Sequence, residues 1–406
     1  MTSQLVLGNG FGVGIASDSA VTWTTSTTQR TYNDAEKIFP LELPHRIAVL
    51  TSNAVALQGL PYDVLIRKWI RSIGNAPESQ MASVSAYHDH FVTWLSTQQT
   101  SWSDQNQDKI DVLGRIDAEI VKLRNTIVPS LENNPDQDPE EVVLDLLKRI
   151  NGDIGPHLLS LEDTTPELLE TVLSELWSND DEDTWTVSSI LGRHLGDLPH
   201  SQAIADEVLL FIRLSLEKDF EFQNGGYTRL AFVGYGANDL LPSVSPLNIA
   251  GKWGDHLWRT PPLLETAQNE GSGFGLIYSQ AQDDQIQLIF KGYDERLLRA
   301  TGEAIADRYS VSEITEDPTE GSTLKETLTQ ELNRLSWDES LKPARTTIAV
   351  LPLTSLVDTA QSLVSFQAIS KTLRGELPTV GGQIQSATIT LDAGFKWRQR
   401  DNERYS

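Results

Sequence analysis

Hydrophobic and small residues alternate along the first part of the chain in a way that predicts β-strands. Gln4 to Leu7 is a short apolar segment, and Gly8-Asn9-Gly10 follows with the residue types of a tight hairpin turn. Phe11, Val13 and Ile15 then alternate with glycine and alanine. This period of two predicts a second strand, and its small face is expected where another element packs closely on the sheet.

A further strand is predicted from Arg46 to Leu50, ending in the polar residues Thr51-Ser52-Asn53. After Pro61 the apolar residues recur at helical spacing, which predicts a helix through Leu65, Trp69 and Ile73. The same spacing predicts further helices at Tyr87–Leu95, Ile110–Ile127, Val142–Ile150, Leu168–Trp177 and Ile204–Leu216.

Strand patterns return after Gly225-Gly226. Strands are predicted at Tyr227–Tyr235, Ser243–Ile249 and Phe274–Tyr278. Helices follow at Gln285–Tyr309, Leu324–Leu335 and Leu353–Leu373, and the chain closes with strands at Ile384–Leu391 and Phe395–Arg398. A sheet whose segments are interrupted by helices predicts a layered α+β fold built as a single domain over residues 1–406.

Composition narrows the function classes. The 406 residues contain 57 acidic and 32 basic side chains, giving a net charge of −25, which disfavours binding to nucleic acid or to anionic membranes. Zero cysteines exclude disulfides, thiolate metal sites and a thiol nucleophile. No secretory signal and no membrane-length apolar run is visible, so a soluble, cytoplasmic protein is expected.

Three motifs that resemble cofactor or metal sites have simpler explanations. The segment Gly8 to Gly12 lacks the lysine of a nucleotide loop and opens a strand rather than a helix. The seven histidines show no metal-ligand spacing, and the acidic run Asp180–Asp183 lacks the glycine and alternating ligands of a calcium loop. No cofactor and no metal are therefore expected.

Several segments, in the same order, resemble one protein family. Phe11–Thr22 resembles the second strand of proteasome β-subunits, Glu36–Pro40 resembles their Lys-Ile-aromatic-Pro segment, and Arg46–Ala54 resembles their next strand. A longer resemblance, to large bacterial proteasome-like proteins, includes Asp18–Thr22, Tyr32-Asn33, Ser52–Ala54, Gly234–Gly236, Pro242-Ser243, Ala281–Asp283, Thr379–Gly382 and Gly394–Trp397.

The resemblance implies the fold of an N-terminal-nucleophile (Ntn) hydrolase, a four-layer αββα sandwich. The core would comprise residues 1–73 and 226–406, and residues 74–225 would be a long helical insertion. The family implies a polypeptide or small amide substrate and a homo-oligomer, without a nucleic-acid or membrane partner.

In this family an N-terminal threonine attacks a carbonyl and its own α-amino group takes the proton. Thr2 lies 16 positions before Asp18, as the family's threonine does before its strand-end aspartate, and removal of Met1 would expose it. Lys37 would keep the amine neutral by charge repulsion, and Asp18 would hold Lys37. The alternatives remain open: Thr2 as an ordinary terminus, Lys37 as a surface lysine and Asp18 as a turn cap.

The remaining site residues depart further from the family pattern. The oxyanion donor would be the backbone N–H of Asn53, with Ser52 as a second candidate, although a strand-end turn also explains both residues. Supporting hydrogen bonds would come from Ser279, Glu376 and Thr379.

Two functions fit the sequence. The first is a threonine-type hydrolase that cleaves peptide or amide bonds. The second is a catalytically inactive proteasome-like subunit that serves assembly or binding. A free Thr2 amine close to Lys37 favours the first, and a retained Met1 or a buried terminus favours the second.

Overall fold

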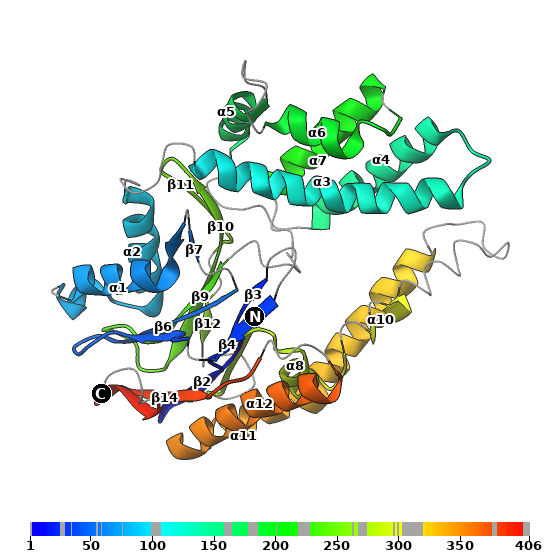
Figure 1. Cartoon of the computed structure of the whole chain (residues 1–406). Coiled ribbons are helices and arrows are strands. Elements are labelled where there is room, and N and C mark those ends of the chain that lie inside the picture. Colours follow the sequence, from blue (N-terminus) through cyan, green and yellow to red (C-terminus); the bar gives the residue numbers. More distant parts are fainter. Residues whose placement is uncertain are drawn as a thin grey trace.

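The computed structural model describes residues 2–24, 29–33, 35–53, 56–57, 59–74, 76–98, 107–157, 165–177, 186–199, 201–217, 228–261, 264–266, 274–294, 297–298, 300–302, 320–375 and 380–400. Helices and antiparallel sheets are combined in these residues, which confirms the α+β class that the sequence predicts (Figure 1).

The first sheet joins the beginning of the chain to its end. Its strand order is β13-β1-β2-β14-β15, and every pairing is antiparallel. The two strands of the predicted N-terminal hairpin, β1 and β2, are neighbours in this sheet. The C-terminal strands β14 and β15 extend the sheet on the β2 side. The strands are β1 (Ser3–Asn9), β2 (Gly12–Ser17), β13 (Leu276–Ala281), β14 (Gln385–Thr390) and β15 (Gly394–Gln399).

The second sheet has the order β11-β10-β9-β6-β5, with β12 paired to β10. Its strands are β5 (Ile38–Pro40), β6 (Arg46–Asn53), β9 (Thr228–Tyr235), β10 (Ser243–Trp253), β11 (His256–Arg259) and β12 (Glu265–Thr266). Two short hairpins lie outside both sheets: β3 (Val21–Thr24) with β4 (Gln29–Tyr32), and β7 (Ala56–Leu57) with β8 (Leu60–Pro61).

The two sheets face each other across a shared apolar core. Val6 and Ile15 of the first sheet pack in one cluster with Ala48, Leu50 and Val233 of the second. Side chains alternate between the faces of a strand, so the neighbouring positions point outward toward helices.

Helices cover the outer face of each sheet. On the six-stranded sheet, Trp69 of α1 (Tyr62–Ile73) and Phe91 of α2 (Val84–Thr97) both contact Phe232 of β9, with ring centroids 5.7 and 5.6 Å away. On the five-stranded sheet, α8 (Asp284–Lys291) and α12 (Leu353–Leu373) bury an apolar cluster that contains Leu5 and Leu356.

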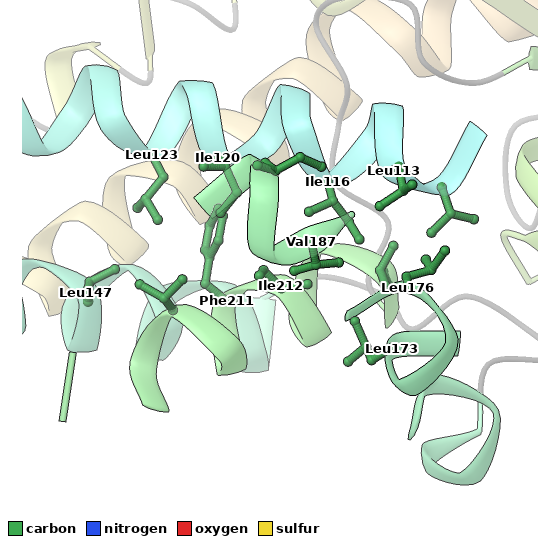
Figure 2. Close-up of a cluster of buried hydrophobic side chains, with 14 of the residues drawn as sticks. Leu113, Ile116, Ile120, Leu123, Leu147, Leu173, Leu176, Val187, Phe211 and Ile212 are labelled. Atoms are coloured by element: carbon green, nitrogen blue, oxygen red, sulfur yellow. The ribbon is translucent and has the colours of Figure 1, made fainter. Parts of the chain in front are cut away.

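A block of helices builds a fourth apolar core of its own (Figure 2). Its elements are α3 (Gln107–Asn133), α4 (Pro139–His157), α5 (Pro166–Trp177), α6 (Val187–Leu195) and α7 (Gln202–Glu217). Trp258 of β11 is buried in the same cluster, so this block packs against one end of the six-stranded sheet. Helix α2 lies within 74–225 but packs with α1 on that sheet instead.

Some predicted boundaries were wrong for local reasons. The sequence pattern predicts one helix over Gln285–Tyr309, but α8 ends at Lys291 because Gly292 adopts a left-handed conformation with φ of 78°. Helix α6, with 9 residues, was not predicted; a capping box between Thr186 and Ser189 starts it. Helix α10 (Glu320–Ser336) continues through a π-helical turn, Trp337–Leu341, into α11 (Lys342–Ile348).

The small face of β2 lies directly against the backbone of α12. A Cβ atom on Gly14 would stand 2.7 Å from the nitrogen of Val357 and 2.9 Å from the carbonyl carbon of Leu356. Atoms of a helix backbone cannot move aside as a flexible side chain can. The close packing that the glycine and alanine positions predict is therefore confirmed, and it sets how near α12 can approach the sheet.

Replacing Gly14 with alanine should push α12 away from β2. We expect Gly14→Ala to lower the free energy of unfolding by about 1–3 kcal/mol, as overpacking of a filled core does. Gly10→Ala is the matched control, because no atom lies within 4 Å of a Cβ at that position. Urea denaturation of the two variants measures both values, and equal stabilities would contradict the packing argument.

Candidate functional site

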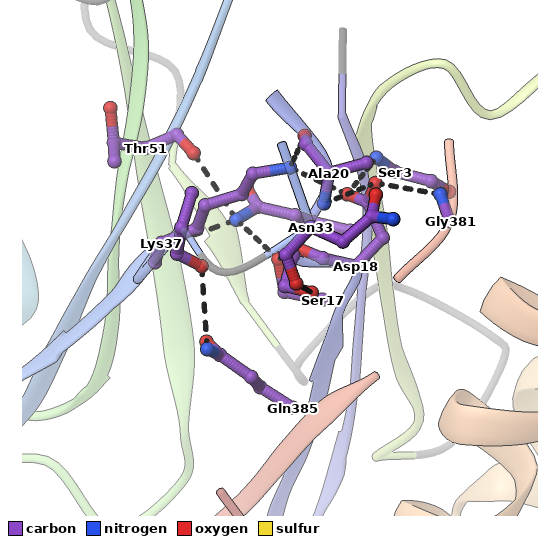
Figure 3. A network of polar contacts seen from close by, with 12 residues as sticks. Ser3, Ser17, Asp18, Ala20, Asn33, Lys37, Thr51, Gly381 and Gln385 are labelled. Carbon is purple, nitrogen blue, oxygen red and sulfur yellow. Dashed lines mark hydrogen bonds and ion pairs between the residues drawn. The ribbon is translucent and has the colours of Figure 1, made fainter. Parts of the chain in front are cut away.

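A buried ion pair joins the end of β2 to the start of β5. Lys37 Nζ lies 2.8 Å from Asp18 Oδ1, and the two side chains are 4% and 0% exposed (Figure 3). Asp18 follows the last residue of β2, and Lys37 precedes the first residue of β5. The pair therefore links the two sheets in a place that water barely reaches.

Three backbone N–H groups complete the environment of the carboxylate. The N–H of Ser3 donates to Asp18 Oδ1 at 2.9 Å, and those of Ala20 and Gly381 donate to Oδ2 at 3.3 and 3.1 Å. A buried carboxylate is tolerated only when its oxygens are hydrogen-bonded. Asp18 thus gathers the chain start, the β2 end and the segment before β14 around one charge.

Lys37 makes a second strong contact. Its ammonium donates to the carbonyl oxygen of Ala20 at 2.5 Å as well as to Asp18. Burial lowers the pKa of Lys37 from its ordinary value, and the neighbouring carboxylate of Asp18 offsets part of this effect. An ammonium has three N–H donors, so one remains for a further group at this site.

Thr2 lies one residue from the pair and is 4% exposed. Its carbonyl oxygen accepts a hydrogen bond from Gln282 N at 2.7 Å, which extends the pairing of β1 with β13 to the chain start. Gln4 and Val6 face the space between the sheets, so alternation places Thr2 on the same face. The described residues Thr2 and Lys37 share no direct hydrogen bond, and Met1 lies outside the described residues.

The end of β13, next to the start of β1, carries backbone strain. Ala281, which pairs with Ser3, has a φ of 69°, and it is the one non-glycine residue with positive φ in the described part of the chain. Such a conformation costs roughly 1–3 kcal/mol for a residue with a Cβ, and strained residues of this kind are enriched at functional sites.

A polar network that the sequence did not predict lies beside the ion pair. Gln4 Nε2 donates to Ser17 Oγ at 3.0 Å and to the carbonyl oxygen of Thr51 at 3.2 Å, and Gln280 Nε2 donates to Gln4 Oε1. The sequence signal that could have indicated this network is Gln4, a polar residue at the start of a mainly apolar strand. These amides tie β1, β13 and β6 together at the depth of Lys37.

The end of β6 lies at the same place. Thr51 N donates to the carbonyl oxygen of Lys37 at 3.1 Å, and Asn53 is the last residue of the strand. Ser52 shares its face with Ala48 and Leu50, toward the other sheet. It is 5% exposed, and its hydroxyl has no hydrogen-bond partner in the described residues. A buried hydroxyl that is available in this way suits a ligand contact.

The structure does not bring Ser279 to the ion pair. Ser279 pairs with Leu5, whose side chain faces the helices, so Ser279 lies on the outer face of the sheet. Its hydroxyl donates to Asp283 Oδ2 at 2.5 Å and accepts from Gln287 Nε2 at 2.6 Å. Ser279 therefore positions the start of α8.

Two other predicted supporting residues, Glu376 and Thr379, lie outside the described residues. The segment that follows them is described, and there Gly381 supplies a backbone donor to Asp18. Gly382, with φ of 72°, packs so closely that a Cβ would meet Ser19 Oγ at 2.5 Å. In the segment Thr379–Gly382, which resembles the family, the two glycines are therefore the residues that contact the surroundings of Asp18.

The described ranges contain no group of three or more histidine, aspartate or glutamate side chains able to hold a metal ion. In the same ranges, no helix has the length and apolar character that crossing a membrane requires.

Removing the charge of Asp18 should leave Lys37 buried without its partner. We expect Asp18→Asn to lower the free energy of unfolding by about 3–5 kcal/mol near neutral pH. The variant's folded Lys37 would lose its proton at a still lower pH, whereas the unfolded chain keeps it up to the ordinary pKa of 10.5. Over the pH range in which the variant's folded Lys37 has lost its proton and the parent's has not, the variant's folded state binds fewer protons, so the deficit should shrink as pH rises.

Denaturation at several pH values measures this deficit. Glu175→Gln, which breaks the exposed pair with Lys109, is the control and should change stability far less. A pH-independent deficit in Asp18→Asn would contradict the proposed origin of the effect.

Comparison with known proteins adds a distant structural likeness. No protein-family model matches the chain, and no curated protein matches it. Among solved structures, Anbu (ancestral beta-subunit) from Yersinia bercovieri aligns with 11% sequence identity, covering 99% of this chain and 89% of that chain, with a TM-score of 0.33. A likeness at that TM-score carries no argument about activity or assembly.

Proposed function

We propose that this chain is a threonine-type N-terminal-nucleophile hydrolase that cleaves peptide or amide bonds, with Thr2 as the nucleophile. One observation carries the proposal. Asp18 Oδ1 accepts hydrogen bonds both from Lys37 Nζ and from the backbone N–H of Ser3, the residue joined to Thr2. The buried cation and the residue that follows Thr2 thus share one carboxylate oxygen, which supports a role for Lys37 in tuning the Thr2 amine.

The packing supports an αββα sandwich of proteasome-like type. Each sheet has one face on the other sheet and one face on helices, as the clusters around Ile15, Phe232 and Leu356 show. We assign residues 1–73 and 226–406 to this core and residues 74–225 to a helical insertion, most of which has a core of its own.

The proposed reaction begins after removal of everything that precedes Thr2. The Thr2 hydroxyl attacks the substrate carbonyl, and the free α-amino group accepts the hydroxyl proton. The amine returns this proton to the leaving nitrogen as the C–N bond breaks, which leaves an acyl ester on Thr2. Water then attacks the ester, and its proton passes through the amine back to the threonine oxygen.

Lys37 and the end of β6 would assist these steps. A positive charge close to the α-amine favours its neutral form, which is the form that accepts a proton. The oxyanion would be stabilised by the backbone N–H of Asn53, with the hydroxyl of Ser52 as a second donor. The available hydroxyl and the position of both residues beyond Thr51 support this assignment.

The substrate would be a polypeptide or a smaller amide, and a homo-oligomer is the proposed assembly. A second candidate function is a catalytically inactive proteasome-like subunit used for assembly or binding. Three observations favour it: Thr2 is buried, Ser279 contacts α8 rather than the ion pair, and no hydrogen bond joins Thr2 to Lys37 within the described residues.

A threonine-directed β-lactone separates the two functions. We expect intact-mass analysis of the processed protein to show one covalent adduct, which peptide mapping places on Thr2, because only an activated hydroxyl opens the lactone. Thr2→Ala should remain unmodified. Thr171→Ala removes an exposed helix threonine and should be modified like the parent protein.

An unmodified protein with a free Thr2 amine would contradict the hydrolase and support the inactive subunit. A protein whose Thr2 remains joined to a preceding residue should stay unmodified under either function, so mass analysis of the terminus accompanies the assay.

Lys37→Met tests the role of the cation. Without the positive charge, the pKa of the Thr2 amine should rise toward the ordinary value of about 7.7–8.0, so less of the amine is neutral at pH 7. We expect slower acylation at pH 7 and a rate–pH curve displaced to higher pH, measured from the rate of adduct formation. Lys148→Met, on the exposed face of α4, should leave the curve unchanged. An undisplaced curve in folded Lys37→Met would refute the tuning role.

A further inference from the structure

A pocket of about 490 Å³ lies between α1, the turn after β5 and the end of β15. Three arginines line it, Arg67, Arg71 and Arg400, in a chain whose net charge is −25. The acidic residues in the lining are Glu36 and Glu42, so the local balance is positive. Guanidinium groups gathered in this way suit carboxylate and phosphate ligands, which they bind through paired hydrogen bonds.

Two of the arginines are held in place before any ligand binds. Glu36 forms ion pairs with both Arg67 and Arg400, the latter at 3.1 Å. The guanidinium of Arg67 also lies over the ring of Phe39, 5.3 Å from its centroid, and that of Arg400 lies 5.0 Å from the centroid of Trp397. Side chains held in this way lose little freedom when a ligand arrives.

The third arginine is available for a ligand. Arg71 lies in the last turn of α1, is exposed, and forms no hydrogen bond or ion pair with the part of the chain that the structure describes. The apolar surface beside it comes from the exposed Leu43 and the half-buried Ile70, with the buried Leu41 and Ile73 behind them. A charged group and an apolar surface thus adjoin in one cavity.

We propose that this pocket binds an anionic amphiphile, with its carboxylate or phosphate group on Arg71 and its apolar body against Leu43 and Ile70. The volume lies within the range of about 300–1,000 Å³ that is usual for small-ligand sites. The pocket lining includes Glu36 but neither Lys37 nor Asp18. The proposal is therefore independent of the hydrolase activity.

Isothermal titration calorimetry on the full chain tests the proposal with four probes. Octanoate and octyl phosphate carry the two head groups on the same body, octan-1-ol has the body without the charge, and inorganic phosphate has the charge without the body. We expect octanoate or octyl phosphate to bind at least tenfold more tightly than octan-1-ol and than inorganic phosphate. The tighter of the two identifies the head group.

Variants then locate the site. Arg71→Gln should weaken binding of the preferred probe roughly tenfold or more, as loss of a charged hydrogen bond does. Arg149→Gln removes an exposed arginine of α4 that also has no partner among the described residues, and it should bind like the parent protein. Circular dichroism checks that both variants are folded. The proposal is overturned by undetectable binding of both amphiphiles, by equal binding of octan-1-ol, or by unchanged affinity in Arg71→Gln.

Discussion

The buried carboxylate of Asp18 is the group on which the rest of the site depends. An ionised carboxylate withdrawn from water needs several donors, and here one ammonium and three backbone N–H groups meet it. These donors come from the start of the chain, from both ends of the β3–β4 hairpin region and from the segment before β14. Satisfying one charge thus fixes four pieces of chain that are remote in sequence.

The same requirement explains why the sheets are held at this end by polar contacts rather than by packing alone. Farther along the strands, the facing side chains are Val6, Ile15, Leu50 and Val233, which attract one another without direction. Near Lys37 they are replaced by the directional hydrogen bonds of Gln4 and Gln280. A directional network specifies one relative position of the two sheets, which a catalytic site needs and an apolar core does not provide.

Local patterns and family resemblance predicted part of this arrangement. The strand ends at Asp18 and Asn53 and the small face around Gly14 were visible because their signals are local in sequence. The contacts of Gln280 with Gln4 and of Gly381 with Asp18 span 276 and 363 residues, and no short-range pattern contains them. Ser279 shows most clearly what sequence patterns cannot predict. The face of the sheet that its side chain occupies depends on strand register, and a shift by one residue reverses that face.

Most donors to Asp18 are backbone groups, so the surroundings of the ion pair place few demands on side chains. Ser3, Ala20 and Gly381 contact Asp18 through backbone nitrogen atoms, so their side chains can differ without removing a donor. These contacts depend on the course of the backbone. At Gly382 the backbone leaves no room for a Cβ atom, which would collide with Ser19. A site defined by backbone geometry leaves fewer side chains for a sequence comparison to detect. Lys37 and Asp18 are the exceptions, because their ion pair depends on the charge of both side chains.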